Sequence, residues 1–344
     1  MGYNKALGVF ALMAMAAGTA AQAATQAYWR FEDKNGLPAI AGDFLRSTPA
    51  GGGAISGGNT VDVTSDSSGN GNELRAFHSP NDPTSPEELQ RLETSPSYTL
   101  TTPSAIILQT GAPNLYAFDF DAAPGIGQQP AGTLPNDAFA DDIYSLDGEN
   151  AAGPINNLVF SQYTVEGAFR VDTLGRFQSI MVKDGNVGTN VALDPAGPLP
   201  SFNVKLFNNN TLNVETFDGA GVPHLITADA PVSAATWYKF AVVNDGSLLQ
   251  LYLDSGSGYV LQADQEAVSG GALFNNNSVW AVGRGWFFGV NDFFDGQIDE
   301  VRISDVALSP SQFLFNAIPE PSTALLMTGA FAACCIRRRR CTRV

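Results

Sequence analysis

The feature that most constrains the fold is a series of short segments, from about residue 155 onward, in which apolar and polar residues alternate. In residues 163–171, Tyr163, Val165, Phe169 and Val171 alternate with mostly polar neighbours, which is the period of a strand buried on one face. Gly, Asn, Asp and Pro separate the segments. We expect strands at residues 27–32, 163–171, 177–183, 202–206, 212–217, 237–243, 248–253, 279–282 and 298–303. This spacing, with almost no helix, predicts an all-β antiparallel β-sandwich.

The N-terminal half carries a weaker strand pattern. Residues 36–72 are rich in Gly and Ser. Residues 79–97 hold several prolines, with one candidate helical segment at 86–92. We therefore expect one domain, residues 25–318, with an irregular insertion at about 79–150.

The first 24 residues predict a signal peptide. Lys5 supplies a positive charge, residues 6–20 are apolar, and Ala21-Gln22-Ala23 fits a signal-peptidase cleavage site. We expect export across the inner membrane and a mature chain that begins near Thr25.

The last 26 residues, 319–344, form a second targeting segment. Pro319-Glu320-Pro321 precede an apolar run, 322–336, in which we expect a single membrane helix, and a cluster follows that consists of Arg337, Arg338, Arg339 and Arg340. The arginines would stay in the cytoplasm, so the preceding domain would lie on the far side of the membrane. The run covers roughly 22 Å of a hydrocarbon core that is about 30 Å thick, which suits a transient anchor.

This tail resembles the PEP-CTERM sorting signal of Gram-negative bacteria in its Pro-Glu-Pro tripeptide, apolar stretch and arginine cluster. The resemblance implies processing near the tripeptide by an exosortase, an integral-membrane cysteine protease. It also implies passage through the inner membrane and delivery to the cell surface or the extracellular matrix. An ordinary C-terminal tail anchor is the alternative.

Charge and cysteine content exclude several classes of function. The chain has 34 acidic and 18 basic residues, a net charge of −16, and six of the basic residues lie in the two terminal segments. Nucleic acid is therefore excluded as a partner. The three cysteines, Cys334, Cys335 and Cys341, all lie in the tail, so the domain has no disulfide and no thiol nucleophile.

Several segments resemble laminin-G-like (concanavalin A-like) jelly rolls. Residues 237–254 look like the central hairpin of that family, with an Asn244-Asp245-Gly246 turn, and residues 294–309 look like its closing strand. Residues 28–33 and 66–72 resemble the opening strand and the loop after it. The resemblance implies that the first and last strands are neighbours in one sheet.

The sequence gives no support for a catalytic site. Glucanases of this fold carry carboxylates at alternate positions of one strand, and no E-x-D-x-x-E pattern is present. Asp299 and Glu300 are adjacent, so on a strand one would face inward and the other solvent. The two histidines, His78 and His224, have no second His or Cys nearby, and we expect ordinary polar roles for both.

Calcium is the ion that the resemblance favours. Asp66 matches the family's loop acid and Asp299 its closing-strand acid, and together they could hold a structural Ca²⁺ with carbonyls and water. The alternative is an Asx turn at Asp66 and an amide hydrogen bond at Asp299.

Aromatic residues near the Gly-rich segment 283–285 suggest a sugar platform. Trp280, Trp286, Phe287 and Phe288 flank this segment, although core packing explains them better. We therefore interpret the chain as an exported, non-enzymatic surface or matrix protein that binds or organises extracellular polysaccharide. The alternatives are a lectin, a glycan-processing enzyme of the same fold, or a protein-binding adhesin.

Overall fold

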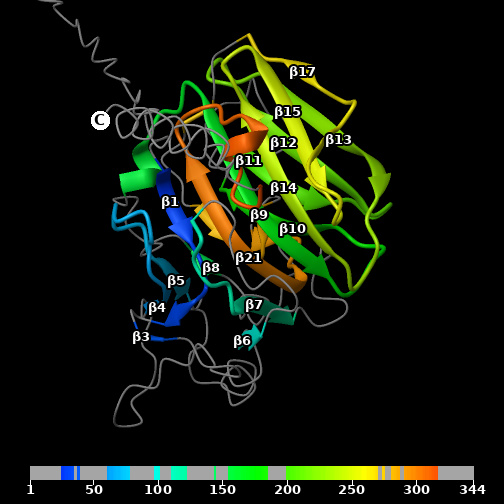
Figure 1. The fold of residues 1–344 in the computed structure, drawn as a ribbon. Helices are drawn as coiled ribbons and strands as arrows, with labels where there is room; N and C mark the ends of the chain where they lie inside the picture. The colour runs from blue at the N-terminus through cyan, green and yellow to red at the C-terminus, as the bar shows by residue number, and fades with distance from the viewer. Residues whose placement is uncertain are drawn as a thin grey trace, which may run out of the picture.

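The structure is a computed structural model that describes residues 25–34, 37–38, 60–77, 97–100, 110–121, 143–144, 154–184, 199–269, 273–275, 280–286 and 290–316. In this part of the chain two large antiparallel sheets pack face to face (Figure 1). The helical turns described are the short 3-10 elements η2 (Pro154–Asn157) and η4 (Pro310–Gln312). The predicted all-β antiparallel sandwich is confirmed.

The first sheet has nine strands in the order β16–β15–β14–β9–β21–β7–β6, with β1 also paired to β21 and β17 to β15. Its strands are β1 (Thr25–Trp29), β6 (Ser97–Leu100), β7 (Tyr116–Asp121), β9 (Tyr163–Val171), β14 (Trp237–Asn244), β15 (Leu248–Asp254), β16 (Val260–Leu261), β17 (Glu266–Ala267) and β21 (Asp295–Ser304). Tyr28 is in register with Arg302, and Trp29 with Val301. The opening and closing strands are thus neighbours, as the resemblance implied.

The second sheet has eight strands in the order β13–β12–β11–β10–β18–β8–β5–β4. Its strands are β4 (Thr60–Thr64), β5 (Leu74–Phe77), β8 (Ile143–Tyr144), β10 (Gln178–Lys183), β11 (Phe202–Leu206), β12 (Thr211–Phe217), β13 (Pro223–Pro231) and β18 (Trp280–Val282). Two further pairs are β2 (Asp33–Lys34) with β3 (Leu37–Pro38), and β19 (Gly285–Trp286) with β20 (Val290–Asn291). Three strands fall in the 79–150 stretch: β6 and β7 belong to the first sheet, and β8 belongs to the second. The segment 86–92 lies outside the described residues.

The core fills the space between the inner faces of the two sheets. Alternate residues of each strand point inward, for example Val204, Val214 and Ile226 on three adjacent strands of the second sheet. Phe202 and Trp280 pack together with ring centroids 5.5 Å apart, and both are buried. Burial of each such side chain contributes roughly 1.5–3 kcal/mol, so this layer holds the sandwich together.

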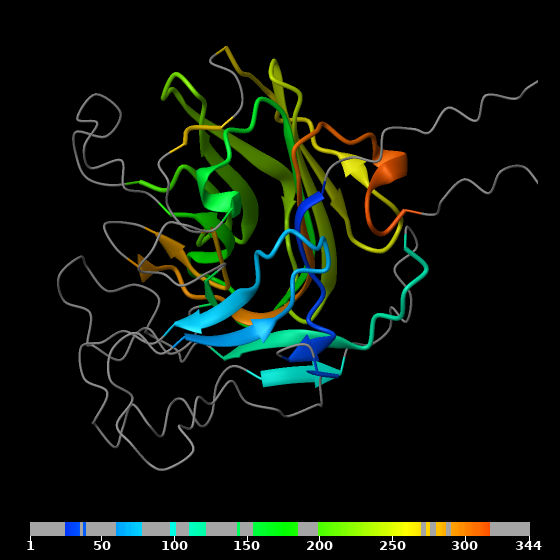
Figure 2. The same ribbon diagram turned by 90° about the vertical axis from the view of Figure 1, so that its left-hand side faces the viewer.

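The outer face of the first sheet is also covered, which the sequence did not predict. Thr164, Glu166 and Ala168 are the outward residues of β9, yet all are buried. The chain after β21, residues 305–316, crosses this face and packs Phe313 and Leu314 onto it (Figure 2). A strand that was expected to be half-buried is therefore buried on both faces.

Two strand predictions need correction. The opening strand ends at Trp29, short of residue 32, because Phe31 has a φ of 57° and turns its side chain into the core. Strand β13 was missed, since exposed Pro223 and Leu225 blur its alternation.

Among the described residues no helix is long and apolar enough to cross a membrane. The predicted membrane segment, 322–336, lies outside them.

Candidate ligand-binding site

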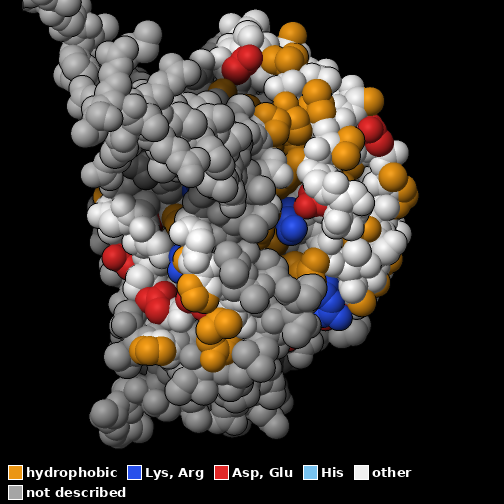
Figure 3. Space-filling model, in the orientation of Figure 1, with side chains coloured by type: hydrophobic (Ala, Val, Ile, Leu, Met, Phe, Trp, Pro, Cys, Tyr) orange, Lys and Arg blue, Asp and Glu red, His pale blue; other side chains and the backbone are white. Residues whose placement is uncertain are grey.

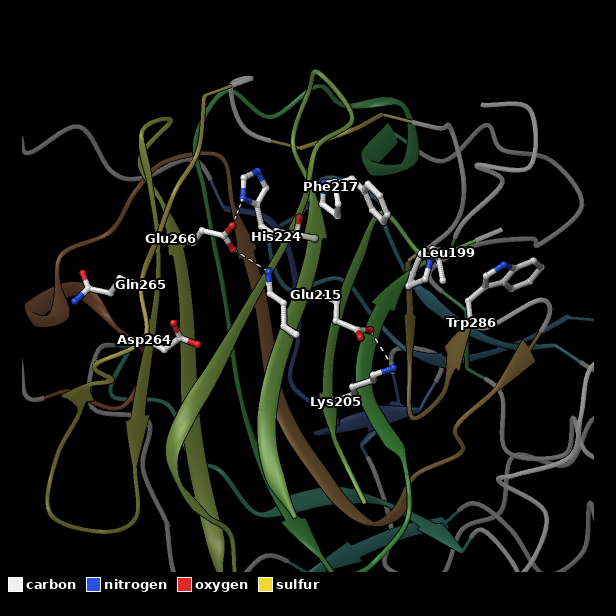
Figure 4. Close-up of a pocket in the computed structure, with 13 residues that line it drawn as sticks. Leu199, Lys205, Glu215, Phe217, His224, Asp264, Gln265, Glu266 and Trp286 are labelled. Atoms are coloured by element: carbon white, nitrogen blue, oxygen red, sulfur yellow. Dashed lines mark hydrogen bonds and ion pairs between the residues drawn. The ribbon is translucent and has the colours of Figure 1, made fainter. Parts of the chain in front are cut away.

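A pocket of about 500 Å³ lies on the second sheet, at the end where β11, β12 and β13 meet the segment before β17 (Figure 4). Lys205, Glu215 and Leu225 belong to the outward face of these strands, because Val204, Val214 and Ile226 point into the core. The apolar part of the lining includes Leu199, Pro200, Phe217, Leu225 and Trp286. The pocket thus combines an apolar surface with charged side chains.

Lys205 is held tightly by its neighbours. Its Nζ lies 3.0 Å from Glu215 Oε2 and 3.7 Å from Asp292 Oδ2. The same ammonium group sits over the rings of Phe177 and Phe207, 5.5 and 5.2 Å from their centroids. Burial raises the pKa of Asp292 to about 6, and the attraction of Lys205 opposes that rise. In the space-filling view a basic and an acidic side chain lie side by side among hydrophobic ones (Figure 3).

The opposite wall comes from the segment that runs beside β13. Glu266 Oε2 accepts the backbone N–H of Leu225 at 2.9 Å, and Asp264 Oδ2 accepts that of Thr227 at 2.8 Å. These carboxylates accept hydrogen bonds from N–H groups of β13, the edge strand of the second sheet. A strand of another molecule could otherwise pair with these N–H groups. The side chains therefore hold the pocket wall to the sheet.

His224 lies between two carboxylates. Its Nε2 is 3.3 Å from Asp218 Oδ2, and its Nδ1 is 3.2 Å from Glu266 Oε1. The residue is buried in β13 and lines the pocket. His224 is the second residue of β13, and the sequence did not show that it lines a pocket because β13 itself was not predicted.

The two tryptophans of the 280–286 segment have different roles. Trp280 is buried in the core, as the sequence favoured. Trp286 is half-buried on the outer face, where it packs on Val182 and Ala281 and lines the pocket, so core packing was the wrong expectation for it. Phe287 and Phe288 lie outside the described residues.

Asp66 holds its own loop. Its Oδ1 accepts the backbone N–H groups of Tyr28 and Ser68, and its Oδ2 accepts that of Asn72. These bonds match the Asx-turn alternative and occupy both oxygens that a Ca²⁺ ion would need. The described residues contain no cluster of three or more His, Cys, Asp or Glu that could hold a metal.

Asp299 and Glu300 correct the expectation that one of them faces solvent. Both are buried, because Glu300 has a φ of 52° and a bulge interrupts the pairing of β21 with β9 at this point. Glu300 accepts hydrogen bonds from Tyr28 Oη and Arg30 Nε. Asp299 Oδ2 accepts one from Asn114, while its Oδ1 has no hydrogen-bond partner. Burial raises the pKa of Asp299 well above its usual range, and the charge of Glu300 adds to the rise.

The sorting residues Pro319, Glu320, Pro321 and Arg337 to Arg340 lie outside the described residues, as does His78. The pocket residues Glu215, Asp264 and Glu266 were missed by sequence reasoning. Two pocket residues carried a signal: Trp286 belongs to the aromatic residues that suggest a sugar platform, and Lys205 alternates with Val204 and Leu206 on a predicted strand.

Residues 147–313 match a family model, Laminin_G_3, described as the concanavalin A-like lectin/glucanases superfamily. Over this part of its length the chain is similar to a laminin-G-like domain. Of the described strands outside that range, β1 and β4 to β8 complete the two large sheets, and β2 and β3 form a separate pair. A search of curated proteins gave no match.

The following three are among the solved structures that are similar to the chain. Domain 4 of AbnA, a GH43 extracellular arabinanase from Geobacillus stearothermophilus in complex with arabinotriose, has 15% identity and a TM-score of 0.45, covering 85% of this chain and 97% of that one. The CBM40 of Ruminococcus gnavus IT-sialidase, bound to α2,3-sialyllactose, has 14% identity and a TM-score of 0.39, covering 58% and 94%. A SAP-like pentraxin from Limulus polyphemus has 15% identity and a TM-score of 0.34, covering 46% and 73%.

Proposed function

We propose that the protein is a non-enzymatic glycan-binding protein that holds or organises extracellular polysaccharide through the pocket on its second sheet. The observation that carries this proposal is the pocket itself, whose lining combines the aromatic side chain of Trp286 with the charged groups of Lys205 and Glu215. A sugar ring has an apolar face and a rim of hydroxyls, so an aromatic surface beside hydrogen-bonding groups suits it. The match to a superfamily of lectins and glucanases supports the same class of ligand.

A glycan array with the purified protein tests the proposal. We expect binding to at least one polysaccharide, and loss of most of that binding in Trp286→Ala. Trp237→Ala is a matched control, because Trp237 is also half-buried but packs on the outer face of the first sheet. Binding to no glycan, or equal loss in both variants, would contradict a pocket of this kind. A protein ligand in place of a glycan would favour the adhesin alternative.

One observation favours the enzymatic alternative. Glu215 and Asp292 both lie within 4 Å of Lys205 Nζ, and burial raises the pKa of Asp292 to about 6, which suits a general acid. Both carboxylates are engaged by the lysine between them, however, and for this reason we prefer binding to hydrolysis. Hydrolysis of labelled glucans by the purified protein, abolished in Asp292→Asn or in Glu215→Gln, would reverse this choice.

We further propose export and sorting by an exosortase, with release at the cell surface or into the matrix of a Gram-negative bacterium. The order of Pro-Glu-Pro, apolar run and arginine cluster supports this proposal. Mass spectrometry of the protein from its native cells is the test. A C-terminus between residues 319 and 322 is expected, and an intact arginine cluster would indicate a plain tail anchor.

A structural Ca²⁺ at Asp66 and Asp299 remains a proposal. The buried Oδ1 of Asp299 supports it, because a cation there would give that oxygen a partner. The three amide bonds of Asp66 weigh against it. If the ion binds, EDTA lowers the melting temperature by several degrees, added Ca²⁺ restores it, and Asp299→Asn responds to neither. An unchanged melting temperature after chelation would contradict a structural Ca²⁺ at this site.

A further inference from the structure

The charges that line the pocket do not balance. Glu215, Asp264 and Glu266 contribute three carboxylates, whereas Lys205 is the one Lys or Arg among the described lining residues. The whole chain is strongly acidic as well, with a net charge of −16. The potential in the pocket is therefore negative, and it attracts cations and repels anions.

Lys205 is not available to an anionic ligand. Glu215 and Asp292 lie on its ammonium group at 3.0 and 3.7 Å, and the two rings of Phe177 and Phe207 flank it. An incoming carboxylate or sulfate would have to displace an existing ion pair. The pocket therefore repels an anionic sugar, and its one lysine is already paired with carboxylates.

The carboxylates can be reached from solvent. The side chains of Glu215 and Glu266 are 31% and 40% exposed, and Asp264 is exposed at the mouth of the pocket. The buried His224 also lines the pocket, and its Nδ1 lies 3.2 Å from Glu266 Oε1.

We infer that the ligand of this pocket is a polysaccharide of amino sugars whose amino groups are free and protonated. The inference rests on the proposed glycan-binding function and names its substrate class. An ammonium group on the sugar ring gains attraction from Asp264 and Glu266, and from the part of the Glu215 charge that Lys205 does not offset. Trp286 adds to this preference, because the face of an indole ring attracts cations. Polymers of uronic acids or sulfated sugars are excluded by the same charges.

Calorimetry with oligosaccharides of equal length tests the inference. The probes are a hexamer of glucosamine, a hexamer of N-acetylglucosamine and a hexamer of galacturonic acid, used at about pH 6, where amines of this kind are protonated. We expect glucosamine to bind about five- to tenfold more tightly than N-acetylglucosamine, and galacturonate not to bind. Salt at about 0.5 M should shrink the difference, since the carboxylates are partly exposed.

Two charge-neutralising variants locate the effect. Asp264→Asn retains an oxygen that can accept the N–H of Thr227, and Glu215→Gln changes a partly exposed side chain, so both should fold, which circular dichroism checks. Each should reduce the preference for the free amine about threefold. Asp229→Asn is the control: it is an exposed carboxylate farther along β13, outside the pocket, and should leave the preference unchanged.

The outcomes separate this inference from the proposed function. Equal binding of the two hexosamine polymers, or tighter binding of galacturonate, would overturn the amino-sugar inference and leave glycan binding in place. If the protein binds none of these probes and no glycan on an array, both the amino-sugar inference and the proposed glycan-binding function are wrong. Equal loss of preference in Asp229→Asn would show that net charge, not the pocket, selects the amine, and would also overturn the inference.

Discussion

Glu166 on β9 accepts the backbone N–H of Leu314 at 2.8 Å, so a buried carboxylate of the first sheet holds the chain after the last strand against that sheet. Arg302 on β21 donates to the other oxygen of Glu166, with Nε at 2.6 Å. The pKa of Glu166 is raised because burial outweighs the attraction of Arg302. One side chain thus connects β9, β21 and the segment 305–316.

Removal of this carboxylate should be costly. Glu166→Ala leaves the guanidinium of Arg302 without its acidic partner and the N–H of Leu314 without an acceptor, so we expect a loss of about 3–5 kcal/mol in the free energy of unfolding. Urea denaturation measures it, and hydrogen exchange should show the largest increase in residues 305–316. Asp172→Ala is the control, because its pair with Arg170 is exposed and contributes at most about 1 kcal/mol. Equal losses in the two variants would show that Glu166 does not hold the segment.

Gly283 should tolerate no side chain. It has a φ of 86°, and a Cβ at this position would overlap the ring of Phe120 in the core. Gly175 has a similar φ of 83° but nothing within 4 Å of an added Cβ. Gly175→Ala should therefore lose about 1–2 kcal/mol from backbone strain alone, and Gly283→Ala roughly 1–3 kcal/mol more from overpacking. Thermal denaturation of both variants checks the difference, and equal losses would mean that Phe120 moves aside at no cost.

The hairpin of β14 and β15 was predictable because local alternation and turn chemistry decide it, whereas the pairing of β1 with β21 was implied by the resemblance alone. Asn244-Asp245-Gly246 forms the expected turn, where Asp245 accepts the N–H groups of Ser247 and Leu248. The outward residues of β9 were not predictable as buried. Glu166 is covered by the segment 305–316, almost 150 residues later in the chain, and no local sequence pattern predicts that contact.

The candidate site was hidden for the same reason. Its charged residues come from β11, β12 and the segment 264–266, and each is ordinary in its own stretch of sequence. Only pairing of strands in space brings Lys205, Glu215 and Glu266 into one pocket. Adjacent acids on a strand were expected to diverge, but the positive φ of Glu300 puts both Asp299 and Glu300 inside.

Asp264 should protect the edge of the second sheet. Asp264→Ala removes the acceptor for the N–H of Thr227, so we expect a loss of about 1 kcal/mol in stability and faster aggregation at high protein concentration. Light scattering over time measures the second effect. Gln265→Ala is the matched neighbour, because its side chain points away from β13 and bonds Gln250 (Figure 4). If both variants aggregate alike, the edge of β13 does not depend on Asp264.

Glu300 should make stability fall as pH rises through the acidic range. Burial raises its pKa from 4.5 to about 7, with Arg30 and Tyr28 opposing the rise. Between about pH 4.5 and pH 7 the folded protein thus holds a proton that the unfolded chain has lost, and the free energy of unfolding falls by up to about 1.4 kcal/mol per pH unit. Glu300→Gln should reduce this slope, leaving the parts that Asp292, Asp299 and Glu166 contribute because burial raises their pKa values as well. Asp245→Asn is the control, because hydrogen bonds from Ser247 lower the pKa of Asp245 and its effect falls below this range. Urea denaturation at half-unit pH steps measures all three proteins, and an unchanged slope in Glu300→Gln would show that Glu300 stays ionised in the folded state throughout.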